Sequence, residues 1–213
     1  MPLLGRREAD DRNRFALPPG VTMANIVDRA PRLSVETDAG SGWVAASPML
    51  ESASTWDDLE WLASLSPLPV LLKGILHPAD AVRAVEYGTQ AILVSNHGGR
   101  QLDSAVATLD ALPAVVEAVA GRAEVLVDGG VRRGTDILTA LALGARAVLI
   151  GRPIHWGLAV GGEAGVRHVL ELLRAELAID LLLCGLASPA EVDRSLIVPA
   201  RSIVGGLPRN GGL

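Results

Sequence analysis

The sequence predicts an α/β protein of the TIM-type (β/α)8-barrel class, to which this 213-residue chain would contribute about four βα units, or half a barrel. From residue 68 onward, short runs that are apolar on both faces alternate with helical segments, which indicates a parallel sheet covered by helices. Residues 86–96 (EYGTQAILVSN) and 142–152 (ALGARAVLIGR) also repeat one pattern of glycine, alanine, apolar run and turn. A doubly wound sheet shows the same alternation, so the repeat favours the barrel only modestly.

The expected elements follow one another in a regular order. A first helix is expected over residues 55–65, with Thr55 as its N-cap and acidic residues in its first turn. The four units are then strand 68–75 with helix 78–88, strand 90–96 with helix 105–121, strand 123–130 with helix 132–144, and strand 146–153 with helix 162–185. The last helix is long, and the sequence leaves open whether it is broken.

Little regular structure is expected outside these units. Residues 1–50 are charged and carry proline and glycine, so we interpret them as a loop region. Residues 51–204 make up the expected half-barrel with the site motifs. Residues 205–213 (GGLPRNGGL) are expected to be a disordered tail.

Composition and charge argue against several classes of protein. The net charge of −5 and the lack of a basic block give no support to nucleic-acid binding. The apolar stretch 177–187 is too short to span a membrane and contains Asp180, and the N-terminus is charged from residue 6, unlike a signal peptide. We therefore expect a soluble cytoplasmic protein, in which the single cysteine, Cys184, is a small core residue.

Polar side chains and glycines gather where the four predicted strands end. These positions carry Lys73, then Ser95, Asn96 and His97, then Asp128, Gly129 and Gly130, and finally Gly151 and Arg152. Because active sites of such barrels lie at the C-terminal ends of the strands, this edge is the expected site. Lys73 adds a hint, since it is the one lysine among 19 lysines and arginines.

The histidine turn has a functional and a structural interpretation. His97 can accept a proton near neutral pH, and Arg100 can bind a carboxylate through two N–H groups. A lone histidine in a turn is more often structural, and that interpretation is kept for His77, His155 and His168.

The two later turns suit an anion. In residues 128–134 and 151–153, glycines let backbone N–H groups approach a phosphate, the following helix favours the anion, and Arg132 and Arg152 could complete the site. Ordinary βα turns with surface arginines are the competing interpretation, which the presence of both turns in this order disfavours. The four tryptophans show no binding pattern and are assigned to packing.

The motifs LLKGI (71–75), SNHGGRQLD (95–103), DGGVRRGTD (128–136) and IGRP (150–153), in this order and spacing, closely resemble those of the FMN-dependent α-hydroxy-acid oxidases and dehydrogenases. That family includes glycolate oxidase, lactate oxidase and mandelate dehydrogenase. Residues 2–15 also resemble the segment that follows the fourth barrel strand in the family.

The resemblance implies a bound FMN and the oxidation of an (S)-2-hydroxy acid to the 2-keto acid, with hydride and carbanion routes both open. It implies that His97 is the catalytic base and that Arg7 and Arg100 bind the substrate carboxylate. Lys73 would lie beside the N1/O2 edge of the flavin and stabilise its anionic reduced form, and Ser95 would hydrogen-bond the flavin region. The residues implied for the ribityl phosphate end are Asp128, Gly129, Gly130, Arg132, Gly151 and Arg152. No metal is implied.

The resemblance also implies missing parts. In the family, four strands, an active-site tyrosine and the aspartate that pairs with the catalytic histidine precede the segment that matches Pro2. Without that aspartate the imidazolium formed in the reaction loses its stabilising charge. Without half of the barrel, open sheet edges would invite pairing with another chain.

Two functions therefore compete. The chain is either the C-terminal part of an FMN-dependent 2-hydroxy-acid oxidase or dehydrogenase, inactive without an N-terminal half, or a non-catalytic half-barrel that binds FMN or phosphate and forms a homo-oligomer. Another FMN or phosphate barrel, such as a type 2 isopentenyl-diphosphate isomerase, is a weaker alternative against which the SNHGGRQLD block argues.

Overall fold

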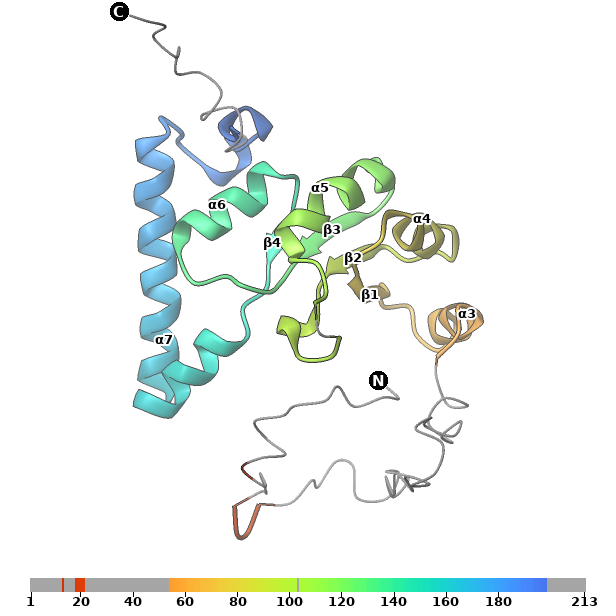
Figure 1. Cartoon of the computed structure of the whole chain (residues 1–213), viewed down its shortest axis with the longest axis horizontal. Helices are drawn as coiled ribbons and strands as arrows, with labels where there is room; N and C mark the ends of the chain where they lie inside the picture. The colour runs from red at the N-terminus through yellow and green to blue at the C-terminus, as the bar shows by residue number, and fades with distance from the viewer. Residues whose placement is uncertain (1–12, 14–17, 22–53, 103, 199–213) are drawn as a thin grey trace, which may run out of the picture.

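The computed structural model describes residues 13, 18–21, 54–102 and 104–198, and the structural statements below refer to these residues. Their centre is a four-stranded parallel sheet with the strand order β1-β2-β3-β4 (Figure 1). The strands are β1 (Leu71–Ile75), β2 (Ala91–Val94), β3 (Glu124–Val127) and β4 (Ala147–Val148). Each strand pairs with the next one along the chain, as expected for successive βα units.

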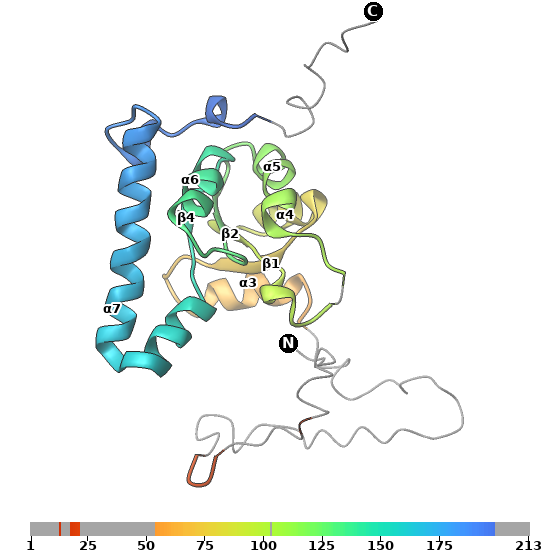
Figure 2. The ribbon, with the colours of Figure 1, turned by 60° about the vertical axis from the view of Figure 1, so that its left-hand side comes forward.

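Helices alternate with the strands, and those that connect two strands cover one face of the sheet. They are α3 (Asp57–Ser64), α4 (Pro78–Glu86), α5 (Thr108–Val119), α6 (Gly134–Ala142) and α7 (Arg152–Leu183), with short 3-10 turns η1 (His97–Gly99), η2 (Pro189–Glu191) and η3 (Arg194–Leu196). Figures 1 and 2 show α4, α5 and α6 side by side along the sheet, with α7 next to α6. The predicted alternation of strands and helices is confirmed.

The core lies between the sheet and the helices. Ile92 and Val94 of β2 are fully buried, together with Leu112 and Val115 of α5. Burying one such side chain contributes about 1.5–3 kcal/mol, so this cluster is the main source of stability. Because side chains alternate across a strand, Lys73 of β1, which pairs with Leu93, lies on the face opposite these helices.

Helix α7 differs from the expected final helix. It begins at Arg152, where the sequence predicted a strand up to residue 153, because Pro153 favours a first helical turn. Gly161 and Gly162 leave the helical conformation and break α7 into two segments. A Cβ on Gly157 would lie 2.7 Å from the carbonyl oxygen of Gly165, so glycine lets the two segments pack closely.

Two further predictions are wrong. The N-cap of α3 is Trp56 rather than Thr55, whose hydroxyl donates instead to Asp58 Oδ2 at 3.0 Å. Cys184 is exposed rather than a core residue, because it follows the end of α7 and two exposed leucines, Leu182 and Leu183. Within the described residues, no helix combines the length and apolar character that crossing a membrane requires.

Candidate active site

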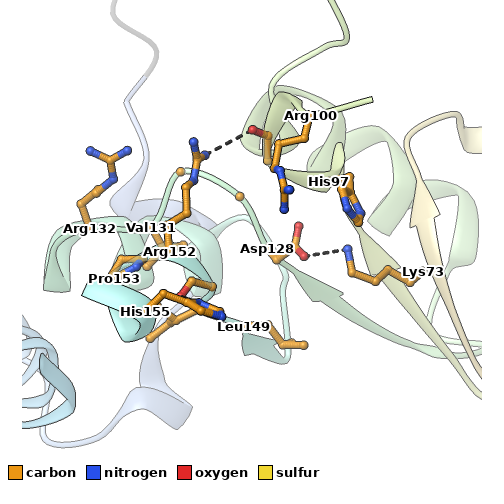
Figure 3. Close-up of a pocket in the computed structure, with 15 residues that line it drawn as sticks. Lys73, His97, Arg100, Asp128, Val131, Arg132, Leu149, Arg152, Pro153 and His155 are labelled. Atoms are coloured by element: carbon orange, nitrogen blue, oxygen red, sulfur yellow. Dashed lines mark hydrogen bonds and ion pairs between the residues drawn. The ribbon is translucent and has the colours of Figure 1, made fainter. Parts of the chain in front are cut away.

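An open cleft of about 300 Å³ lies at the C-terminal ends of the strands. Nine predicted site residues line it, namely Lys73, His97, Arg100, Asp128, Gly129, Gly130, Arg132, Gly151 and Arg152 (Figure 3). Ser95 is buried beside it, with 2% of its surface exposed. The fold therefore brings together residues that span 80 positions of sequence, because parallel strands present their ends at one edge.

Lys73 is held by two partners at the ends of neighbouring strands. Its Nζ lies 2.6 Å from Ser95 Oγ and 2.9 Å from Asp128 Oδ2. The other carboxylate oxygen of Asp128, Oδ1, is buried and has no hydrogen-bond partner among the described residues. A buried carboxylate oxygen without a donor costs free energy, so Oδ1 marks a place where a ligand could donate a hydrogen bond.

The turn that carries His97 has a strained backbone with its own supports. His97 has a φ of 55°, in the left-handed region that a residue with a side chain rarely adopts. Ser95 Oγ accepts a hydrogen bond from His97 N–H at 3.1 Å, and Asn96 Oδ1 accepts one from Gly99 N–H at 3.3 Å. Asn96 Nδ2 donates to the carbonyl of Val106 at 3.3 Å. Strain of this kind concentrates at functional sites.

Asn96 also lies against the glycine turn after β3. A Cβ on Gly129 would be 3.2 Å from both Asn96 Oδ1 and Thr108 Oγ1, and the φ of Gly129 is +91°. Gly130 has a φ of +82° but open space around it. Sequence reasoning did not identify Asn96 as a support of the site, although an asparagine just after a strand is a common capping residue.

Carboxylates accept backbone N–H groups at the start of α6. Asp136 Oδ2 accepts the N–H groups of Arg132 at 2.8 Å and Arg133 at 2.9 Å, and Glu176 Oε2 from α7 accepts that of Gly134 at 2.8 Å. These three N–H groups are therefore not available to a phosphate, whereas the predicted roles of Gly129, Gly130 and Arg132 stay predictions. An anion at this turn would rely on Gly129, Gly130 and the side chain of Arg132.

Glu176 also pairs with the side chain next to this turn. Its carboxylate lies 3.1 Å from Arg133 Nε. The hydrogen bond from Gly134 N–H, followed by the one from Arg133, lowers the pKa of Glu176 below its ordinary value. Glu176 therefore stays ionised at neutral pH and fixes α6 against α7.

The opposite side of the cleft is formed by the turn between β4 and α7. Arg152 Nη2 donates to the carbonyl of Gly98 at 3.3 Å, which connects this turn to the one that carries His97. Figure 3 shows Arg132 and Arg152 at one end of the cleft and Lys73, His97 and Asp128 at the other. Among the described residues that line the cleft, four lysine and arginine side chains stand against one carboxylate, which makes the cleft suited to anions.

Trp156 is a second residue that sequence reasoning missed. The guanidinium carbon of Arg132 lies 4.9 Å from the centroid of its ring, and 48% of Trp156 is exposed, so this tryptophan contacts a cleft residue, which the assignment to packing did not include. The sequence did contain a signal for this residue, because a tryptophan follows Arg152 by four positions in the helix that begins at Arg152.

Some predictions fall on residues that the structure does not describe. Arg7, expected to bind the substrate carboxylate, lies outside the described residues, as do nearly all of residues 1–50 and the whole of 205–213. In the described part, no group of three or more His, Cys, Asp or Glu side chains could hold a metal ion.

Comparisons with known proteins point to one family. The family model for FMN-dependent dehydrogenases matches residues 1–199. An L-lactate oxidase of Nostoc sp. is 58% identical over 92% of this chain and 54% of its own length, and human 2-hydroxyacid oxidase 1 is 49% identical over 92% and 54%. Two solved structures of mandelate oxidase are also similar, one with (S)-2-phenylpropionate and one of a variant with a C4a-OH-FMN adduct. Each has a TM-score of 0.76 and is 47% identical over 91% of this chain. The match covers 51% of the first structure's chain and 52% of the second's. The chain thus spans about half the length of the relatives that it matches.

Proposed function

Because this chain belongs to the FMN-dependent dehydrogenase family, we propose that it contributes the C-terminal half of a (β/α)8 barrel that oxidises an (S)-2-hydroxy acid to the 2-keto acid with FMN. In this proposal residues 51–204 are the half-barrel and residues 1–50 the connecting loop region. The chain would be inactive until an N-terminal half completes the pocket.

The single observation that carries the proposal is the content of the cleft. A histidine, Arg100, Lys73 and two glycine-rich turns with arginines line one space of about 300 Å³. FMN has three parts that need polar partners, namely its phosphate, the hydroxyls of its ribityl chain and the polar edge of its ring. The substrate adds a carboxylate. The cleft offers a chemical match to each of these parts.

The residues present fit FMN. Gly130 leaves open space at the turn after β3, which lets a phosphate approach the backbone, and Arg132 and Arg152 supply positive charge at that end. Buried Asp128 Oδ1 could accept a hydrogen bond from a ribityl hydroxyl. Ser95 and Asp128 hold Lys73 Nζ, which would support negative charge on the polar edge of the ring.

The chain's own residues would bind the substrate and move its proton. Arg100 would bind the substrate carboxylate together with Arg7, and this orients the α-carbon. His97 would take one proton from the substrate as general base, and its turn is held by Ser95 and Asn96. Bound FMN would accept the two electrons and the second hydrogen that leave the substrate.

Complementation tests the proposal. The chain is mixed with the N-terminal half of the Nostoc relative, and FMN is added. We expect a yellow complex whose flavin colour is bleached anaerobically by L-lactate, glycolate or (S)-mandelate, with one equivalent of 2-keto acid formed. The complex with His97→Gln should keep the yellow colour and lose the bleaching. A colourless mixture, or a yellow one that no 2-hydroxy acid bleaches, would contradict the proposal.

A second candidate function is kept because, among the described residues, no strand pairs with the outer edges of β1 and β4. Leu71 on β1 is 43% exposed and Leu149 beyond β4 is 39% exposed, so both ends of the sheet present apolar side chains. We propose as the alternative that the chain pairs with itself and binds FMN without turnover. A monomer in solution, measured by light scattering with size exclusion, would exclude this alternative. Location in the cytoplasm is part of both proposals.

A further inference from the structure

Arg132 differs from the neighbouring cations in that its guanidinium contacts an aromatic ring instead of a carboxylate. Within the described residues, Arg133 pairs with Glu176 and Lys73 pairs with Asp128, whereas no carboxylate forms an ion pair with the guanidinium of Arg132. That guanidinium instead lies over the ring of Trp156, with 4.9 Å between its carbon and the ring centroid. A cation–π contact does not neutralise the guanidinium, so its charge remains available to an anion.

Arg132 has contacts at its backbone and at the tip of its side chain. At its base, the backbone N–H donates to Asp136 Oδ2 at 2.8 Å. At its tip, the charge is attracted to the negative face of the indole ring. Arg132 is therefore held in place without losing its charge to a carboxylate, as a binding site for an anion requires.

The position of Trp156 is itself determined by the break in α7. Trp156 belongs to the first segment of the helix, next to His155 and Pro153, which line the cleft. The close approach of Gly157 and Gly165 packs this segment against the second one. With 48% of its surface exposed, Trp156 lies outside the core and contacts Arg132, which lines the cleft.

We propose that Trp156 is a positioning residue for the cofactor phosphate, which holds the guanidinium of Arg132 so that the cleft prefers FMN over riboflavin. This inference rests on the proposed binding of FMN and adds the residue that sets its phosphate preference. Riboflavin carries the same ring and ribityl chain without the phosphate, so the ratio of the two dissociation constants isolates this end of the cleft.

The test is a titration of the purified chain with FMN and with riboflavin, followed by flavin fluorescence. Trp156→Leu is expected to weaken FMN binding about two- to fivefold, the range for an exposed cation–π contact, and to leave riboflavin binding unchanged. Trp156→Phe should give a smaller loss, since its ring is less effective. Trp61→Leu is the matched control, because Trp61 is exposed on α3 outside the cleft.

A double-mutant cycle with Arg132→Gln separates positioning from general packing. In the Arg132→Gln background, neither Trp156→Leu nor Trp156→Phe should lower FMN affinity further. The inference is overturned if either variant weakens both ligands equally, if its effect persists without Arg132, or if both bind FMN like the wild type. The Phe variant gives this answer even if the Leu variant fails to fold. A wild-type chain with no preference for FMN would overturn the phosphate site as well.

Discussion

Lys73 Nζ lies 2.9 Å from Asp128 Oδ2, so a cation from the end of β1 neutralises a carboxylate that follows β3. The strand between them provides a third member, because Ser95 Oγ lies 2.6 Å from the same nitrogen. Three strand ends are thus joined at one ammonium group. Several consequences of this arrangement and of its neighbours can be measured.

Lys73→Gln should lower the free energy of unfolding by about 1–2 kcal/mol, because the largely buried carboxylate of Asp128 loses its cation. Lys73 is partly exposed, so this loss should be smaller than for a fully buried ion pair. Urea unfolding measures the change in free energy. Asp128→Asn should cost less in the Lys73→Gln background than in the wild type. Strictly additive losses would show that the pair is energetically unimportant.

Asn96→Ala should lower the free energy of unfolding by about 1–2 kcal/mol, because two hydrogen bonds of the turn at His97 are lost. Asn96→Asp is the matched variant, since it keeps an acceptor for Gly99 N–H and loses the donor to the carbonyl of Val106. Its loss should be about half. If both variants unfold at the wild-type urea concentration, Asn96 does not support the turn.

Gly129→Ala and Gly130→Ala form a matched pair. Both glycines have a positive φ, so alanine at either position should cost about 1–2 kcal/mol in backbone strain. At Gly129 the new methyl group would also press on Asn96 and Thr108 at 3.2 Å, whereas at Gly130 it would meet open space. Thermal unfolding should therefore show the lower melting temperature for Gly129→Ala, and the reverse order would contradict the described packing.

Gly134→Ala should be more damaging than most alanine substitutions in a helix. The added methyl carbon would lie 2.6 Å from the carbonyl carbon and from Cβ of Glu176, which forces α6 away from α7 at a cost of about 1–3 kcal/mol. Gly161→Ala, which meets no atom within 4 Å and lies at the break in α7, is the control. Equal melting temperatures for the two variants would argue against a close contact between α6 and α7.

Glu176 should give the fold a dependence on acid. Its pKa is lowered in the folded chain, first by the hydrogen bond from Gly134 N–H and then by Arg133. The stabilisation is therefore fully present above the ordinary pKa of a glutamate and is lost as the pH falls through the lowered folded value. Glu176→Gln should reduce the fall of the urea midpoint that the wild type shows as the pH drops below the ordinary pKa of a glutamate. If the urea midpoint of the variant changes with pH as it does in the wild type, other carboxylates cause the acid sensitivity.

The sequence allowed prediction of the alternating units and the strand-end residues, because apolar runs and glycine turns are local patterns. It did not predict the contact of Glu176 with Gly134, which joins two helices through residues 42 positions apart. The start of α7 at Arg152 was also missed, since an apolar run leading into GRP was interpreted as a longer strand. Trp156 was assigned to packing because the four tryptophans show no binding pattern, and its contact with Arg132 of another unit is not visible in the sequence.

The carboxylates at the start of α6 determine how an elongated anion can enter the cleft. Asp136 and Glu176 accept three backbone N–H groups on that side, and the charge of Asp136, which has no ion-pair partner among the described residues, repels an anion there. Arg132 and Arg152 attract the same anion at the adjacent edge. The electrostatic field in the cleft therefore attracts an anion toward the two arginines and away from Asp136. A ligand with a charge at one end would be turned so that this end faces the arginines before its neutral end contacts the cleft.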